Sequence, residues 1–173
     1  SVSTVNPSSF DGDARVTITG SNFDGPNLSV TVGGVACIIA SSTADTILCD
    51  LESLVLPGGQ LPVIVADSSN GKSVTNGQMT NDPLITGVSP AFGSEHGGQL
   101  VTISGRGLIG QDAITIGTNV ATLQQSNADG SVVVLTGAGT IGAADVHVNS
   151  AYMDSAYTVA GQYEYRDSIS LVW

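Results

Sequence analysis

The chain carries the same strand, turn and strand pattern twice. One copy runs from Leu84 to Leu108, where Leu-Ile-Thr-Gly-Val-Ser-Pro leads through a glycine-rich turn to Leu-Val-Thr-Ile-Ser-Gly. A weaker copy runs from Val2 to Phe23. Apolar residues alternating with Ser and Thr are typical of half-buried strands, and the Gly and Pro clusters between them indicate turns. This duplication predicts two copies of one structural unit.

The repeat extends along the whole chain at a nearly constant offset. The aligned pairs, 83 to 85 residues apart, are Pro7 with Pro90, Gly20 with Gly105, Val30 with Ile114, Val63 with Val146, and Gly77 with Gly161. Only 11% of the residues are charged and 22 are glycine, which favours short strands and turns over helices. We therefore predict an all-β chain of two tandem β-sandwiches, over residues 1–82 and 83–167.

The expected strands follow one another at the even spacing of a sandwich. In the first module they are 2–5, 16–19, 28–32, 35–39, 46–51, 61–66 and 73–80. In the second module they are 85–88, 100–104, 113–116, 120–124, 132–136, 145–149 and 157–165.

A further strand-like segment, 168–173, follows the second module. Ser168-Ile-Ser-Leu-Val resembles the opening Ser1-Val-Ser-Thr-Val, and Ile169, Leu171 and Trp173 would share one face. An unpaired apolar strand is prone to pair with another chain. Either a longer protein was cut here, or the strand inserts into another subunit by strand addition. Because the chain opens directly on a strand pattern, we expect Ser1 to begin a mature or trimmed product.

Charge and hydropathy exclude two classes of partner. Four Lys and Arg stand against 15 Asp and Glu, a formal net charge of −11. Binding to nucleic acid or to anionic lipid would lack its main driving force. No apolar run approaches the roughly 20 residues that a membrane-spanning helix needs. We therefore expect neither nucleic acid as a partner nor insertion into a membrane.

The second module carries the residues of a known family. Ile85-Thr-Gly-Val-Ser-Pro90, the Gly97-Gly98 pair, Val101-Thr-Ile-Ser-Gly105 and Leu108 resemble the IPT/TIG immunoglobulin-like family. The resemblance covers nearly all of residues 1–167 and implies two immunoglobulin-like sandwiches. The family occurs in plexins, in receptor and surface proteins and in certain transcription factors, so it implies a fold more than a function.

The two cysteines bear on the compartment. Cys37 and Cys49 are similar to the cysteine pair of the family's extracellular members, which implies a disulfide and an extracellular or cell-surface location. The alternative is a pair of small buried thiols in a reducing compartment. A zinc site is not expected, since two cysteines and two distant histidines do not supply four ligands. The second module has Thr122 where Cys37 stands in the first.

Two glycine-rich stretches match a dinucleotide-binding pattern, but only by chance. Residues 105–110 and 137–142 both have the form Gly-x-Gly-x-x-Gly. A dinucleotide requires the third glycine to open a helix, whereas residues 113–116 and 143–148 have strand patterns. We expect no cofactor.

The acidic turns and the histidines also lack the context of a site. Asp11, Asp13 and Asp24 suggest calcium, but no loop with the spacing of a calcium site continues from them, and we interpret them as solvated turn carboxylates. His96 lies in a turn and His147 on the polar face of a strand, and neither has a neighbouring nucleophile with an orienting acid. We expect no catalytic residue.

Three further features concern modification and packing. Asn27-Leu28-Ser29 is an N-glycosylation sequon just before a strand, where a turn would expose it. Tyr163 and Tyr165 share one strand face and form either core or a contact surface; we favour core for them and assembly for Trp173.

These observations favour a non-enzymatic extracellular protein with a structural or adhesive role. Its expected partners are copies of itself or neighbouring immunoglobulin-like modules, assembled head to tail into a surface filament through residues 168–173. One alternative is a fragment of a long cell-surface receptor or adhesion protein. Another is an accessory carbohydrate-binding module of a secreted enzyme, with glycans as partners.

Overall fold

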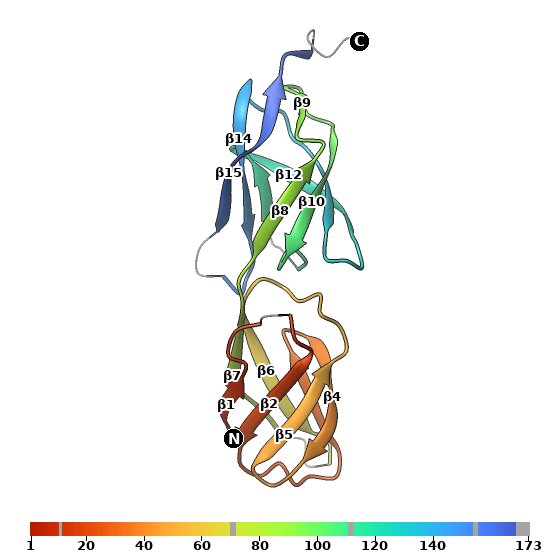
Figure 1. Ribbon diagram of the computed structural model, residues 1–173, viewed down its shortest axis with the longest axis vertical. Coiled ribbons are helices and arrows are strands. Elements are labelled where there is room, and N and C mark those ends of the chain that lie inside the picture. Colours follow the sequence, from red (N-terminus) through yellow and green to blue (C-terminus); the bar gives the residue numbers. More distant parts are fainter. Residues whose placement is uncertain (11, 70–71, 111–112, 154–155, 169–173) are drawn as a thin grey trace. The chain divides into compact units, whose positions relative to one another are not determined.

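The computed structural model describes residues 1–10, 12–69, 72–110, 113–153 and 156–168, and the chain divides into two units (Figure 1). One unit comprises Ser1–Leu56 and Gln60–Asp82, and the other comprises Pro57–Gly59 and Pro83–Trp173. The described elements are β-strands. The all-β fold class predicted from the sequence is therefore confirmed.

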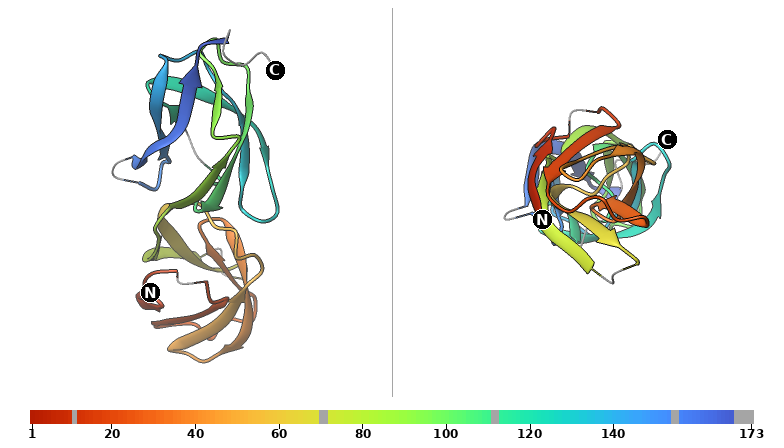
Figure 2. Two further views of the ribbon diagram at one scale, coloured as in Figure 1. Left: turned by 45° about the horizontal axis from the view of Figure 1, so that its top comes forward. Right: turned by 90° about the horizontal axis from the view of Figure 1, so that it is seen from below.

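The first unit is one curved sheet of seven strands. Its strands are β1 (Val2–Asn6), β2 (Arg15–Gly20), β3 (Leu28–Val32), β4 (Val35–Ser42), β5 (Thr46–Leu51), β6 (Gly59–Asp67) and β7 (Lys72–Asn81). They lie in the order β1-β2-β5-β4-β3-β6-β7. Seen end on, these strands run around a common axis (Figure 2), and buried side chains such as Ile18, Ile47 and Val63 form the core.

The second unit repeats this arrangement with one strand more. Its strands are β8 (Leu84–Ser89), β9 (Phe92–Ser94), β10 (Leu100–Arg106), β11 (Ala113–Ile116), β12 (Asn119–Ser126), β13 (Val132–Leu135), β14 (Gly142–Asn149) and β15 (Tyr157–Arg166). They lie in the order β8-β10-β13-β12-β11-β14-β15-β9. Removing β9 from this list leaves the order of the first unit, as a duplication requires.

The first strand of each unit pairs at one border of the sheet and then crosses to the other. In the first unit β1 pairs with β2, and the chain beyond cis-Pro7 then runs beside β7, where Phe10 N–H donates to Thr80 O at 2.7 Å. In the second unit β8 pairs with β10, and β9, beyond cis-Pro90, runs parallel to β15. The sheet is thus nearly closed in each unit.

Strand β9 was not predicted from the sequence. It has only three residues, Phe92-Gly-Ser94, and no alternation of apolar and polar side chains. Its position is set by pairing with β15, to which it is parallel and from which it is distant in sequence. Local pattern carries no signal for such a pairing.

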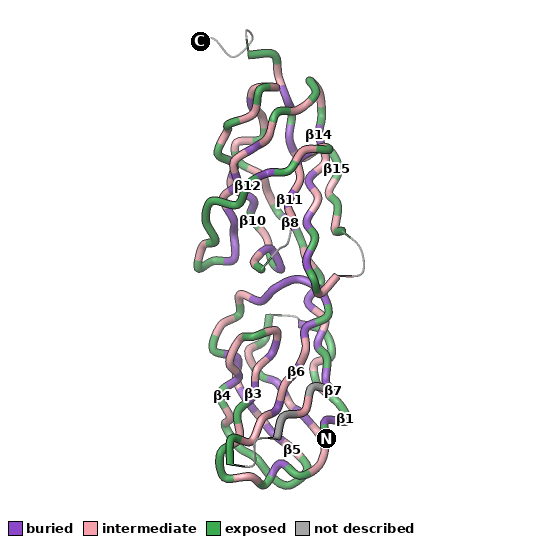
Figure 3. Tube along the Cα trace, turned by 180° about the vertical axis from the view of Figure 1, so that it is seen from behind, coloured by how far each residue is buried: buried purple, intermediate pink, exposed green. Residues whose placement is uncertain are grey.

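The core of each unit is built by strict alternation. Val16 and Ile18 of β2 and Val101 and Ile103 of β10 are fully buried, and the Thr residues between them are only partly buried. Strands β5, β6 and β14 alternate in the same way between buried and more exposed positions (Figure 3). Because side chains of a strand point to opposite faces in turn, one face of each curved sheet forms the interior and the other meets solvent.

Candidate functional site

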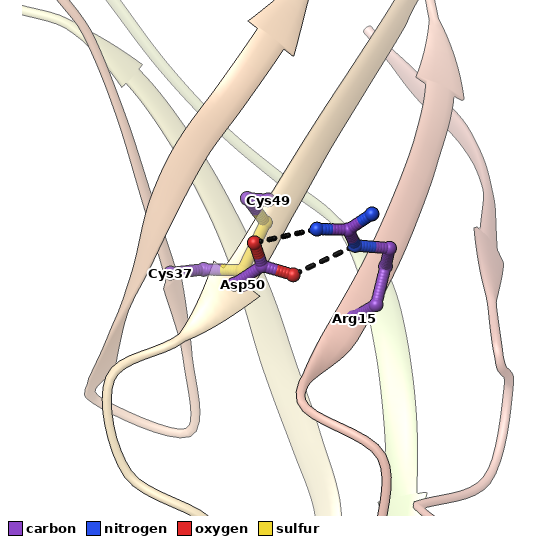
Figure 4. A network of polar contacts seen from close by, with 4 residues as sticks. All are labelled: Arg15, Cys37, Cys49 and Asp50. Carbon is purple, nitrogen blue, oxygen red and sulfur yellow. Dashed lines mark hydrogen bonds and ion pairs between the residues drawn. A yellow bond between two sulfur atoms is a disulfide. The ribbon is translucent and has the colours of Figure 1, made fainter.

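The structure contains a disulfide that joins two neighbouring strands of the first unit. Cys37 on β4 and Cys49 on β5 are bonded with their Cα atoms 5.4 Å apart (Figure 4). Their residues are only 3% and 0% exposed. The bridge is part of the core and no thiol is left to react, since the described residues contain no free cysteine. Disulfides of this buried kind are structural and persist in oxidising compartments.

An ion pair lies on the outer face of β2 and β5. The Arg15 guanidinium on β2 donates from Nε to Asp50 Oδ1 at 2.8 Å and from Nη2 to Asp50 Oδ2 at 2.9 Å (Figure 4). These hydrogen bonds lower the pKa of Asp50 and raise that of Arg15. The two side chains are 60% and 41% exposed, so solvent screens the pair and its effect on stability is small.

Sequence reasoning missed this ion pair. Arg15 and Asp50 are 35 residues apart and become direct neighbours only through the register of β2 with β5. Pairing the two strands by their buried residues, Val16 with Cys49 and Ile18 with Ile47, would have placed the opposite charges side by side.

The second unit fills the position of the disulfide with apolar side chains. Val30 pairs with Cys37 in the first unit, and the corresponding Ile114 pairs with Ala121 in the second. The expectation that Thr122 takes the place of Cys37 is therefore wrong by one residue. Ala121 and Val134 are 4% and 0% exposed, so a small and a larger apolar residue take the place of the sulfur atoms.

The outer face changes character between the units as well. Arg15 and Asp50 form one row on β2 and β5. On β10 and β13 the corresponding row is Leu100 paired with Leu135, and Leu100 is 54% exposed. The same fold therefore presents a polar row in one unit and an apolar row in the other.

The sequon asparagine is accessible. Asn27 lies exposed in the turn before β3, and its Nδ2 donates to Ser69 Oγ at 2.8 Å. Its own backbone oxygen accepts from Ser68 N–H at 3.2 Å.

Two tyrosines of β15 belong to the core, as the sequence interpretation favoured. Tyr163 and Tyr165 are each 1% exposed, and their rings meet edge to face with centroids 5.1 Å apart. The Tyr165 hydroxyl donates to Gly137 O at 3.0 Å. Burial raises the pKa of both hydroxyls. Tyr163 and Tyr165 thus belong to the core of the second unit and do not form a contact surface.

The two histidines lie at the surface of the second unit. His96 is exposed in a turn, with its Nδ1 3.1 Å from Glu95 Oε1. His147 on β14 is half-buried, and its Nδ1 lies 2.8 Å from Thr158 Oγ1. His96 Nδ1 also lies 3.4 Å from Ser94 Oγ, so each imidazole is next to a hydroxyl. In the described part of the chain, neither imidazole has a carboxylate at its other ring nitrogen to orient it as a base.

The remaining candidate motifs do not come together as sites. Both glycine-rich stretches lead into strands, β11 and β14, so the helix that a dinucleotide needs is missing from them. Asp24 is exposed, and Asp11 lies outside the described residues. Nowhere in the described ranges do three or more His, Cys, Asp or Glu side chains gather closely enough to hold a metal ion. Within the same ranges, no helix is long and apolar enough to cross a membrane.

The proposed assembly residues Ile169, Leu171 and Trp173 lie outside the described residues. Of that segment only Ser168 is described, and its hydroxyl donates to Glu95 Oε1 at 3.3 Å.

The chain belongs to a known family of immunoglobulin-like modules. The IPT/TIG domain matches twice, over residues 1–80 and 83–165, and the chain is a tandem pair of such domains.

The similar proteins are much longer than this chain. Fibrocystin-L of Homo sapiens is 34% identical over 116 residues, which cover 61% of this chain and 3% of fibrocystin-L. Plexin A3 of Danio rerio is 32% identical over 117 residues, covering 61% of this chain and 6% of the plexin. The chain therefore spans a few per cent of the length of either relative.

One solved structure shares the fold over nearly the whole chain. The surface glycan-binding protein PbSGBP-B from Prevotella bryantii aligns with 96% of this chain and 42% of its own, with a TM-score of 0.59. Sequence identity is 13%, so the likeness is one of fold alone.

Proposed function

We propose that this chain acts outside the cell as a non-enzymatic structural or adhesive element, through contacts made by its module surfaces. The observation that carries the proposal is the buried Cys37–Cys49 disulfide. A domain of about 85 residues buries a modest core, and a covalent link is a common supplement in secreted domains of this size. The same bond would be out of place in a reducing cytosol.

The family membership supports a contact role. IPT/TIG domains are immunoglobulin-like modules, and the chain holds two of them in tandem. Both interiors are filled by packed side chains such as Phe23, Ile103 and Tyr163. Contacts with partners would therefore be made by the outer surfaces of the two modules. Its relatives contain far more chain than these two modules, so we extend the proposal to a segment of a longer cell-surface protein.

The carbohydrate-binding alternative is less well supported. Sugar rings are often held by exposed aromatic side chains, whose flat faces cover the apolar side of the sugar. Every aromatic residue in the described part of the chain is buried or half-buried, including Tyr152 and Tyr157. The glycan-binding name of the Prevotella protein remains a statement about that protein, given the low sequence identity.

Assembly through residues 168–173 remains a proposal from the sequence. Ile169, Leu171 and Trp173 would offer one apolar face to a neighbouring copy. A head-to-tail contact of this kind generates a filament when it does not close into a ring.

Labelling of intact cells that make the protein tests the location. A membrane-impermeant amine reagent should label it, and an alkylating reagent should modify Cys37 and Cys49 only after denaturation and reduction. Labelling only in lysed cells, with both cysteines alkylated without reductant, would contradict the proposal. The Cys37→Ala/Cys49→Val variant carries the residue types that the second unit has at these positions. It is the control for alkylation, because it has no cysteine to modify.

A further inference from the structure

The sequon Asn27-Leu28-Ser29 lies where the first unit passes from a turn into β3. Asn27 and Ser29 are both exposed, whereas Val30 is buried in the core. Leu28 lines a cavity of about 380 Å³ together with Phe23 and Val65. Because side chains alternate along a strand, Leu28 takes the inner face and leaves Ser29 on the outer face. Both residues that a glycosyltransferase must recognise are thus presented to solvent.

The acceptor amide is held in a defined position. Ser69 Oγ accepts from Asn27 Nδ2 at 2.8 Å, and Ser68 N–H donates to Asn27 O at 3.2 Å. Ser69 is itself fixed, since its backbone N–H donates to Asp67 Oδ1 at 2.9 Å. An amide nitrogen carries two hydrogens, and a sugar replaces only one of them. The remaining N–H can keep the bond to Ser69, so modification does not require this corner of the unit to rearrange.

We propose that Asn27 carries an N-linked glycan. The donor is a lipid-linked oligosaccharide pyrophosphate of the secretory pathway. The bond between its anomeric carbon and the pyrophosphate oxygen breaks, a bond from that carbon to Asn27 Nδ2 forms, and the amide proton leaves with the pyrophosphate. The inference rests on the proposed extracellular function, because only an exported chain meets such a donor.

The chain contains a natural contrast to this sequon. Asn6-Pro7-Ser8 has the same outer residues, but proline in the middle position excludes recognition. Asn6 and Ser8 are also exposed, so accessibility alone does not distinguish the two asparagines. A glycan on Asn27 and none on Asn6 is therefore the expected pattern.

A glycan at this position also limits where partners dock. Ser29 pairs with Ala66, and Leu28 pairs with Asp67, so Asn27 lies beside the last residues of β6. A branched sugar there covers the outer ends of β3 and β6. Protein contacts of the first unit would then use the outer face of β2, β5 and β4, where Arg15 and Asp50 lie.

The test is secretion of the whole chain from a eukaryotic host, followed by mass spectrometry of the intact protein and its peptides. The wild type should be heavier than its polypeptide by one glycan, and enzymatic removal of the glycan should convert Asn27 to Asp. Ser29→Thr should keep the added mass. Ser29→Ala and Asn27→Gln should abolish it, while each stays secreted with the disulfide formed.

The outcomes separate this inference from the proposed function. A secreted, disulfide-bonded wild type without added mass would overturn glycosylation and leave the extracellular role intact. Added mass that persists in Ser29→Ala would place the sugar elsewhere and would also overturn the inference. A chain that is retained in the cell with reduced cysteines would overturn both.

Discussion

At the scale of single residues, each buried tyrosine of β15 depends on a glycine opposite it. A methyl group at Gly93 would overlap the Tyr163 hydroxyl, and one at Gly139 would overlap the Tyr165 ring. The Tyr163 hydroxyl is buried and makes no hydrogen bond of ordinary geometry, although Thr136 comes close enough to offset part of the rise in its pKa. The packing of the ring therefore matters more for stability than the hydroxyl does.

Gly93→Ala should destabilise the second unit by about 1–3 kcal/mol, the usual cost of overpacking a core. Tyr163→Phe should cost little, since it removes a hydroxyl without a partner. In the Tyr163→Phe background the Gly93→Ala cost should largely disappear, because the next nearest atom is Gln99 Cβ at 3.2 Å. Denaturant unfolding of the four proteins measures the coupling, and an unchanged Gly93→Ala cost in the double variant would contradict this account.

The same tyrosines predict a loss of stability in alkali. Burial raises the pKa of Tyr163 and Tyr165, so the folded chain holds these protons more tightly than the unfolded chain does. Their contribution is fully present below the unfolded pKa of about 10 and is lost as pH rises through the higher folded pKa. The melting temperature of the second unit should fall above that pH in calorimetry. Tyr163→Phe should reduce the fall, and an equally steep fall in that variant would exclude Tyr163 as a cause.

At the scale of strands, the two units solve the same packing problem differently. The first joins β4 to β5 with a disulfide, and the second packs Ala121 and Val134 at the corresponding positions. Both positions are buried in both units. The second unit thus has the same fold without a disulfide, so the disulfide of the first unit adds stability to a fold that does not require it.

Reduction of the disulfide should therefore weaken the first unit without unfolding the second. Cys37→Ala/Cys49→Val should lower the unfolding free energy of the first unit by about 3 kcal/mol, the loop-closure value for a ring of this size. Calorimetry should show one transition moving down and the other fixed. Adding reductant to the double variant serves as the control and should change nothing, whereas a shift of both transitions would contradict independent stabilisation.

The sequence pattern predicted the positions of most strands, but it did not predict which distant strands and residues pair with one another. Strands β3, β5 and β11 have the expected bounds, because each alternates apolar and polar residues between clear turn signals. Strand β9 and the Arg15–Asp50 pair depend on contacts between distant segments. The error at Thr122 is one of offset, because 85 residues separate Cys37 from Thr122, whereas the strand pairing places Ala121, 84 residues after Cys37, opposite Ile114.

At the scale of the whole molecule, negative charge is spread over both halves of the chain. Residues 1–82 contain eight acidic and two basic residues, and residues 83–173 contain seven and two. Copies of the chain repel one another at low salt, so self-association requires apolar contact to overcome the charge. If residues 168–173 form a strand, Ile169, Leu171 and Trp173 would share one face, and the segment has no charged side chain, so it could supply such an apolar contact.

Deleting residues 168–173 should abolish assembly and leave both units folded. Electron micrographs and sedimentation of the full chain should show filaments, and those of the truncated chain should show single subunits with unchanged melting. Ser170→Ala, on the other face of the segment, is the matched control and should still assemble. Filaments in the truncated chain, or single subunits in the full chain, would refute a role for this segment.

The way in which the first strand of each unit crosses between borders of its sheet constrains any such polymer. The hydrogen bond from Phe10 to Thr80, and the pairing of β9 with β15, occupy one border of each sheet. A strand from another copy that adds at this border must therefore first displace the segment that is already paired there. For addition at this border, the rate of filament growth would be limited by how often the paired segment detaches. A strand from another copy, once paired there, would likewise dissociate rarely.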